Sequence, residues 1–284
     1  MPSLRFSRFV LPFLLALWVF VPAQAQTRAQ TQEPAKPASQ CQMIAQALPG
    51  VIFARFNGPA ADLAQAEADG TVAITYIGHS TFFIETPAGI RIATDYNGWY
   101  KPPALPTVVT MNKAHSSHYT RVPDPGIEHV LHGWRDDGGP ADHDVVAGDA
   151  YIRNVPTDIR SWGGVMEANG NSIFIFEIAG LCIGHLGHLH HELTEKQYAE
   201  IGRLDVLMVP VDGGLTMGAE SMSRVVERLR SALILPMHRR GPPIDHFLSM
   251  FEEGFDITFA DTARVEVSVR SLPRRPTILV LKGV

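Results

Sequence analysis

CIGHLGHLHHELT, residues 182–194, is the stretch that decides how this sequence can fold, because an apolar run leads directly into a cluster of histidines. Two other stretches have the same build, namely VVTMNKAHSSHYT at residues 108–120 and LILPMHRR at residues 233–240. In each of them, apolar and β-branched residues typical of a buried strand precede the imidazoles. Strands that end side by side would bring these histidines to one edge of a sheet, which is how metal sites are usually assembled.

The order of the remaining elements favours a layered fold. Residues 72–95 alternate apolar and polar side chains around Pro87-Ala88-Gly89, which indicates a β hairpin. Helices are expected at residues 40–48, 192–201 and 219–229. Further strands are expected at residues 107–111, 127–131, 144–146, 150–155, 172–178, 181–184, 204–211, 232–235, 265–269 and 277–281. A β-rich first half followed by a β-α-β-α-β half predicts two sheets packed between helices.

The N-terminus reads as a secretory signal peptide. Arg5 and Arg8 precede an apolar stretch, and Ala23-Gln24-Ala25 forms an A-x-A cleavage site. An uncleaved membrane anchor is the alternative, but the apolar stretch is shorter than the roughly 20 residues needed to cross a bilayer. We therefore expect residues 1–25 to be removed and the protein to be exported, periplasmic or secreted, with no membrane association afterwards.

The composition after this segment is that of an ordinary globular domain. Residues 26–40, rich in Gln, Ala, Pro and Thr, predict a flexible linker, and residues 41–284 predict a single domain. The full chain is 45% hydrophobic with a formal net charge of −5, and the absence of a basic stripe argues against nucleic acid as a partner.

Two cysteines, Cys41 and Cys182, leave two readings open. In an exported chain they could form one disulfide with nothing left over. Alternatively, Cys182 could be a small buried thiol within its apolar strand. The sequence does not decide between these readings.

Four motifs, in order and spacing, resemble the metallo-β-lactamase fold. They are ITYIGHSTFFIETPAGIRIATD at residues 74–95, the histidine stretch at 108–120, HLGHLHHELTEKQYAEIGRLDVLMVPVDGGLTM at 185–217, and LILPMH at 233–238. The most similar branch is that of the short ascorbate-6-phosphate-lactonase-like hydrolases. This resemblance implies an α/β fold (α+β in some schemes), an αββα sandwich of two mixed β-sheets flanked by helices, and a metal-dependent hydrolase.

The resemblance also implies a reduced set of metal ligands. The family motif His-x-His-x-Asp-His falls on residues 113–118, where Lys113 replaces a histidine and Ser117 the aspartate. A further histidine is expected at about position 159, which is Ile159 here. His188 aligns with the family's bridging aspartate, and the terminal histidine remains as His238.

Three imidazoles and water form the ligand set of a catalytic zinc. We therefore expect one zinc ion, with iron or manganese as alternatives, held by His118, His188 and His238. His115 is a further candidate ligand or proton shuttle.

Such a site would use a metal-bound hydroxide to attack an ester, lactone or phosphoester. Lys113 would stabilise the oxyanion or bind an anionic group, whereas Ser117 can hydrogen-bond but cannot be a general base at neutral pH. Arg239 and Arg240, with Lys113, would form a basic rim, which suggests an anionic small-molecule substrate.

Other residues are expected to support the site from behind. His79, Asp95 and His185 are candidates for holding the ligands in place. Asp95 and Asp212 follow apolar strands, where they would orient a histidine or, more simply, cap a turn. His190 and His191 would be the solvated start of a helix.

A protein of another class remains the alternative. The ligands lost at positions 113, 117 and 159 are also what a non-catalytic binding or scaffold protein with a degenerate site would show. The sequence contains neither a Gly-x-Ser-x-Gly elbow nor a phosphate-binding loop, so other hydrolytic chemistry has no motif to support it. Substrate and oligomeric state are left open.

Overall fold

The hairpin predicted at residues 72–95 starts the first of two sheets. The computed structural model describes residues 38–45, 70–160, 163–251 and 253–284. In it, β1 (Val72–Gly78), β2 (Thr81–Glu85) and β3 (Arg91–Ala93) pair antiparallel, and β4 (Val108–Met111) and β5 (His129–His132) continue in parallel. With β13 (Arg264–Val267) beside β1, this six-stranded sheet has the order β13-β1-β2-β3-β4-β5.

The second sheet has eight strands in the order β12-β14-β11-β10-β9-β8-β7-β6. Its antiparallel half consists of β6 (Asp144–Ala147), β7 (Ala150–Arg160), β8 (Met166–Ile178) and β9 (Leu181–His185). From β9 onward it is parallel, through β10 (Val206–Pro210), β11 (Leu233–Met237), β14 (Thr277–Val280) and β12 (Asp256–Phe259).

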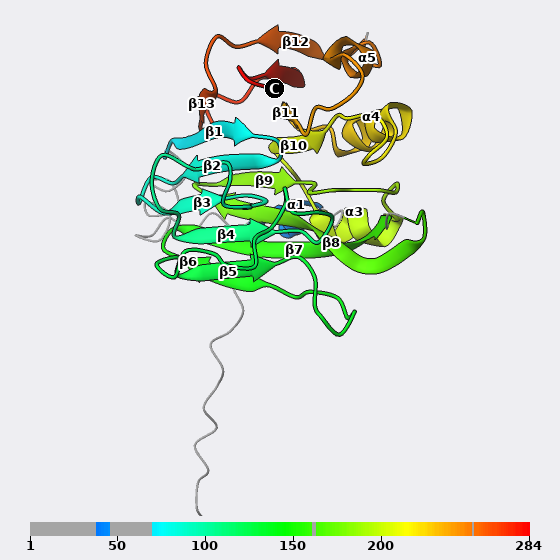
Figure 1. Cartoon of the computed structure of the whole chain (residues 1–284). Helices are drawn as coiled ribbons and strands as arrows, with labels where there is room; N and C mark the ends of the chain where they lie inside the picture. The colour runs from blue at the N-terminus through cyan, green and yellow to red at the C-terminus, as the bar shows by residue number, and fades with distance from the viewer. Residues whose placement is uncertain (1–37, 46–69, 161–162, 252) are drawn as a thin grey trace, which may run out of the picture. The chain divides into compact units, whose positions relative to one another are not determined.

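The two sheets pack face to face on one apolar layer (Figure 1). Phe82 and Ile84 of β2 lie in the same buried cluster as Phe174 and Phe176 of β8, and none of the four is accessible to solvent. Burying a side chain of this size contributes about 1.5–3 kcal/mol. Because successive strand residues point to opposite faces, Phe83 instead lies on the outer face of the first sheet.

Helices cover the outer face of the eight-stranded sheet: α1 (Gln40–Ala45), α3 (Glu195–Ile201), α4 (Ala219–Leu229) and α5 (Ile244–Leu248). Met222, Val225 and Val226 of α4 pack in the same cluster as Leu207 and Val209 of β10. On the other sheet, the described residues around Phe83 that complete the outer layer come from loops, including Tyr96, Tyr119 and Trp134. The predicted sandwich of two mixed sheets is confirmed, in the α+β class.

Two predicted strands turn out much longer. β7 and β8 extend through polar residues that the sequence left outside them, and they pair along nearly their whole length, for example Thr157 with Asn171. The hydrogen bonds between β7 and β8 therefore keep these polar residues in strands, although their sequence pattern does not predict a strand. This hairpin carries one wall of the histidine region described below.

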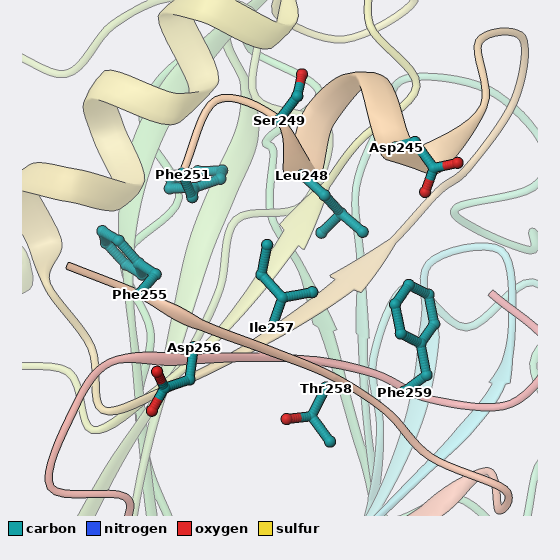
Figure 2. A pocket seen from close by; sticks show the side chains of 9 residues that line it. All are labelled: Asp245, Leu248, Ser249, Phe251, Phe255, Asp256, Ile257, Thr258 and Phe259. Carbon is teal, nitrogen blue, oxygen red and sulfur yellow. The ribbon is translucent and has the colours of Figure 1, made fainter. Parts of the chain in front are cut away.

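The sequence missed α5 and β12. All four residues of β12 are exposed, so buried and exposed side chains do not alternate along this strand. Together the two elements border an open pocket, where Leu248, Phe251, Phe255, Ile257 and Phe259 gather (Figure 2). No histidine lines this pocket.

The start of the described domain is fastened to the eight-stranded sheet by a disulfide and a buried ion pair. Cys41 of α1 and Cys182 of β9 form a disulfide, so the reading of Cys182 as a free thiol is wrong. Glu177 of β8 accepts hydrogen bonds from Ser39 and from the Gln40 amide, and it forms an ion pair with Arg153 at 3.0 Å. Ser39 and Gln40, expected at the end of a linker, are therefore attached to the sheet.

No helix among the described residues is long and apolar enough to span a membrane. The predicted signal peptide and residues 26–37 of the predicted linker lie outside the described residues.

Breaking the Cys41–Cys182 disulfide should destabilise the protein, because the bond closes a loop with a sequence separation of 141 residues. Disulfides that close long loops stabilise proteins by about 2–4 kcal/mol. Urea unfolding with and without reductant measures this loss. The Cys41→Ala/Cys182→Ala double variant is the control, because its stability should not respond to reductant. An unchanged midpoint for the reduced wild type would contradict the expected role of the bond.

Candidate metal centre

Polar residues follow six strands, three in each sheet. Within each sheet these three strands run in the same direction, so their carboxyl ends lie at one edge. In the six-stranded sheet β1, β3 and β4 are mutually parallel, and in the other sheet β9, β10 and β11 are. The residues that follow these strands in turn are His79, Asp95, His115 with His118, His188, Asp212 and His238. The predicted gathering of histidines at one sheet edge thus includes residues from both sheets.

His118 and His238 form the centre of this group. Both are fully buried, and their Nε2 atoms lie 3.1 Å apart. On the other side of each ring, Nδ1 of His118 donates to Asp95 Oδ2 at 2.6 Å, and Nδ1 of His238 donates to Asp212 Oδ2 at 2.7 Å. Because each Nδ1 carries a hydrogen, the two Nε2 atoms are the ring nitrogens left to bind a metal ion.

Two imidazole nitrogens that face each other at this distance need a proton or a metal ion between or beside them. A proton is a poor candidate at His118, because burial and then the neighbouring imidazoles lower the pKa of this residue well below its usual value. A metal ion satisfies both nitrogens, and a histidine ligand whose other nitrogen donates to a carboxylate is the usual arrangement around a metal.

His79 and His115 complete a tight group of four. One nitrogen from each of His79, His115, His118 and His238 lies within 4.8 Å of the others. Ser117 Oγ lies 2.7 Å from His79 Nε2 and 2.6 Å from His115 Nδ1. A hydroxyl has one hydrogen to donate, so it donates to one ring and accepts from the other. The ring that donates to Ser117 keeps a lone pair on its second nitrogen, whereas the other ring carries its hydrogen there.

His188 lies against this group rather than in it. Its ring centre is 4.7 Å from that of His118 and 4.8 Å from that of His238. It is 3% exposed, and neither of its ring nitrogens has a partner in the described structure. Leaving a buried polar group unsatisfied costs about 1–3 kcal/mol. The unpartnered His188 ring and the facing Nε2 atoms of His118 and His238 both show that these residues fit a metal ion.

Burial and neighbouring imidazoles lower the pKa values of His79, His115 and His188. Burial, followed by the charges of His238 and His115, lowers the pKa of His79 to about 3. Burial is also the main cause of the lowered pKa values of His115 and His188. Neutral imidazole is the form that binds metals.

Asp95 and Asp212 hold the central histidines from behind. Burial raises the pKa of Asp95 to about 6, and Asn112 Nδ2 donates to its Oδ1 at 2.9 Å. Burial alone would also raise the pKa of Asp212, but hydrogen bonds from His238 and from the Thr216 and Gly214 amides bring it below its usual value. Asp212 therefore orients a histidine and caps a loop at the same time, whereas the sequence favoured capping alone.

Three further histidines use both ring nitrogens within the protein. His185 donates from Nε2 to the Ser80 carbonyl and accepts from the Gly187 amide. His190 accepts from the Arg160 amide and donates to the Leu215 carbonyl. His191 accepts from the Asp158 amide and donates to the Glu192 carbonyl. The expectation of a solvated helix start at residues 190–191 is wrong, because both rings accept hydrogen bonds from amides of β7 and α3 begins at Glu195.

A cavity of about 570 Å³ opens beside these histidines. His115, His188, Lys113, Ile159 and Arg240 are among the residues that line it, and we call it the histidine cavity. Lys113 forms an ion pair with Glu167 in the same wall, so its ammonium group already has a carboxylate partner. Ile159, where the resemblance led us to expect a ligand, supplies apolar surface and is 4% exposed.

The backbone of the site is strained at three of its residues. His79, Asp95 and His238 have φ values of 55°, 43° and 53°, in the left-handed region. Each such residue costs about 1–3 kcal/mol, and strain of this kind concentrates at functional sites.

Sequence reasoning missed two asparagines that shape the loop before His188. A Cβ at Gly187 would lie 2.4 Å from both Asn112 Nδ2 and Asn171 Oδ1, so only glycine fits there. Asn171 accepts the His188 amide hydrogen at 2.7 Å. In the sequence, the one signal for these contacts is the glycine in Leu186-Gly187-His188.

The chain matches a known family over this region. The family model described as "Beta-lactamase superfamily domain" matches residues 73–238, which include all four histidines of the tight group. Among curated proteins, the UPF0173 metal-dependent hydrolase of Pyrococcus abyssi is 26% identical over 227 residues, which are 69% of this chain and 96% of that protein. A UPF0173 metal-dependent hydrolase of Salinibacter ruber is 26% identical and covers 66% of this chain and 94% of its own length.

Solved structures have the same fold. A Thermotoga maritima protein of the metallo-beta-lactamase superfamily, assigned as a Zn-dependent hydrolase, superposes with a TM-score of 0.56 at 27% identity. It covers 74% of this chain and 98% of its own. The metallo-beta-lactamase fold protein YhfI of Bacillus subtilis, at 9% identity and a TM-score of 0.50 over 76% of this chain and 98% of its own, is similar in fold alone.

Replacing Asp95 with asparagine should weaken metal binding. The Asp95→Asn side chain can still accept from His118, but it loses the charge that makes this imidazole a better donor to a metal. Changes of this kind typically weaken metal binding 10–100-fold. Competition with a chromophoric zinc chelator measures the change.

Asp149→Asn is the matched control, because Asp149 accepts hydrogen bonds from Thr86 and Ala88 in a turn without a member of the histidine group. An unchanged zinc affinity in Asp95→Asn, or an equal loss in Asp149→Asn, would contradict the assigned role.

Proposed function

Because the chain belongs to the beta-lactamase superfamily, we propose that it is an exported metal-dependent hydrolase of metallo-β-lactamase fold that acts on an ester, lactone or phosphoester of a small molecule. The observation that carries the proposal is the pair of facing Nε2 atoms of His118 and His238, each ring fixed from behind by a buried carboxylate. The metal-dependent hydrolases similar to this chain support the reaction class.

His118 and His238 would hold the metal, with further nitrogens available from His79, His115 and His188. A donor set of imidazoles favours zinc, with iron or manganese as alternatives, and one ion per chain. When bound, such an ion polarises a substrate oxygen and lowers the pKa of bound water.

The protein's own groups would then position the reactants and move protons. Asp95 and Asp212 keep the hydrogens of His118 and His238 on Nδ1, away from the centre. His115 lines the histidine cavity, and burial lowers the pKa of its ring, so at neutral pH it can accept a proton. Ser117 connects His115 to His79 and is no substitute for the lost aspartate as a base.

The histidine cavity suits a small substrate. Its volume of about 570 Å³ lies within the range of roughly 300–1,000 Å³ that is usual for small-molecule sites. Ile159 and Leu215 supply apolar wall, while the Lys113–Glu167 pair offers both a donor and an acceptor. Lys113 would bind a polar substrate group without bringing an uncompensated positive charge.

Export is supported by two independent features. The N-terminal segment has the build of a signal peptide, and a structural disulfide between Cys41 and Cys182 is typical of oxidising compartments. The mass of the exported protein tests this part of the proposal: we expect that of residues 26–284, and a mass that includes residues 1–25 would contradict cleavage.

A non-catalytic binding protein is the second candidate. It is favoured by the pairing of Lys113 with Glu167 and by Ile159, which cannot bind a metal. Such a protein would keep the fold and the cavity without turnover.

Hydrolysis separates the two candidates. Zinc-loaded protein, assayed against a panel of esters, lactones and phosphoesters, should turn over at least one class, and His238→Ala should lower kcat at least about 100-fold because a metal ligand is lost. His246→Ala, an exposed histidine of α5, is the matched control and should keep full activity. A zinc-loaded protein that hydrolyses nothing in the panel would favour the binding protein, and equal losses in the two variants would overturn the assigned centre.

A further inference from the structure

A second cavity is lined by His79. It has a volume of about 550 Å³, and we call it the basic cavity. Its wall includes Tyr76, His79, Tyr100, Arg239, Arg240 and Lys282. These residues come from the ends of β1 and β11, from the loop after β3 and from the chain after β14, so the cavity is built from distant parts of the sequence.

The charged side chains that line this cavity are all positive. Arg239, Arg240 and Lys282 are exposed, and the described structure records no ion pair or hydrogen bond for their side chains. No aspartate or glutamate lines the cavity. In the histidine cavity, by contrast, Lys113 is paired with Glu167, and the Arg160 guanidinium donates to backbone carbonyls of residues 214–216.

The basic rim expected from the sequence is therefore composed differently. Lys113 was expected to join Arg239 and Arg240, but it does not line the basic cavity, and it already has Glu167 as a partner. Lys282, far away in sequence, takes its place beside Arg239. Three cationic side chains on one cavity wall repel one another, and a bound anion would relieve this repulsion.

The basic cavity adjoins the proposed reaction centre. His79 lines it and also belongs to the tight group of four histidines. Arg240 lines both cavities. A molecule with one group in the basic cavity can therefore extend toward the histidines with another.

The shape of the wall is fixed by aromatic packing. The Tyr100 ring stacks on His79 with ring centres 6.2 Å apart, and it covers Gly78 so closely that a Cβ there would lie 2.6 Å from the ring. The Tyr76 hydroxyl donates to the His79 carbonyl. These contacts hold His79 and the cavity wall together as one rigid unit.

We propose that the basic cavity is an oxyanion subsite, in which Arg239, Arg240 and Lys282 bind a phosphate or carboxylate group of the substrate. This assignment rests on the proposed hydrolase function, because the subsite is meant to hold the substrate whose bond is broken beside the histidines. It narrows the substrate class to anionic esters, lactones or phosphoesters.

Calorimetric titration with inorganic phosphate tests the subsite in the protein as purified, with acetate as a second probe. Lys282→Ala and Arg239→Ala should each weaken phosphate binding about tenfold, since each removes a charged hydrogen-bond donor. Lys282 is the cleaner position, because Arg239 adjoins His238. Lys196→Ala is the matched control: this lysine is 84% exposed on α3, and its loss should leave phosphate affinity unchanged.

The two probes separate the two sources of the oxyanion. Phosphate binding at least tenfold tighter than acetate binding assigns the subsite to phosphate, and similar affinities assign it to carboxylate. Phosphate affinities of Lys282→Ala and Arg239→Ala within twofold of wild type, or no binding of either probe by the wild type, would overturn the subsite.

Metal content, measured on the same samples, separates this inference from the proposed function. Phosphate binding that depends on Lys282 in a protein without metal or turnover would leave the anion site standing as a binding site and remove the hydrolase. If the protein shows turnover but neither variant changes its phosphate affinity, the hydrolase would stand and the anion site would be removed. Equal metal content in wild type and Lys282→Ala shows that the lost affinity belongs to the basic cavity.

Discussion

Two buried imidazoles, His118 and His238, face each other with their Nε2 atoms 3.1 Å apart, and the arrangement of the whole site depends on this contact. Asp95 and Asp212 fix a hydrogen on the far side of each ring, so the Nε2 atoms on the near sides are the candidate metal ligands. One histidine follows a strand of each sheet, and the sandwich brings the two together. A metal ion bound at this contact would satisfy both Nε2 atoms.

The same logic applies to the surroundings of the pair. His188 is buried without a partner, Asp95 is a fully buried carboxylate, and three site residues adopt left-handed backbone conformations. Each of these features lowers the free energy of unfolding of the protein by itself. The apolar layer between the sheets, and the disulfide that fastens α1 to β9, supply the stability that makes them tolerable. Metal binding would return part of this free energy.

Much of the fold could be predicted because its signals are local. Helix α4 has the predicted bounds, since one face is apolar and the other charged. The strands that precede the histidines were predicted from their apolar runs, and their common edge followed from the parallel order. The exposed strand β12 and the polar ends of β7 and β8 could not be found in this way, because pairing partners rather than side-chain patterns stabilise them.

The site was less predictable, because its contacts join distant segments. Nothing in the residues around His79 shows that its ring meets His238, 4.0 Å away between ring centres. The pairing of Lys113 with Glu167, and of Cys41 with Cys182, likewise depends on how β8 and β9 are placed. The sequence does not show that Lys282 and Arg239 line one cavity, because this depends on where β14 pairs in the sheet.

Elemental analysis of the purified protein, prepared without chelator or histidine tag, tests the central claim most directly. The facing imidazoles predict about one zinc, iron or manganese ion per chain, and loss of that ion in His118→Ala. A protein that stays folded and metal-free even after metal is added would contradict the account, and two ions per chain would contradict the single site.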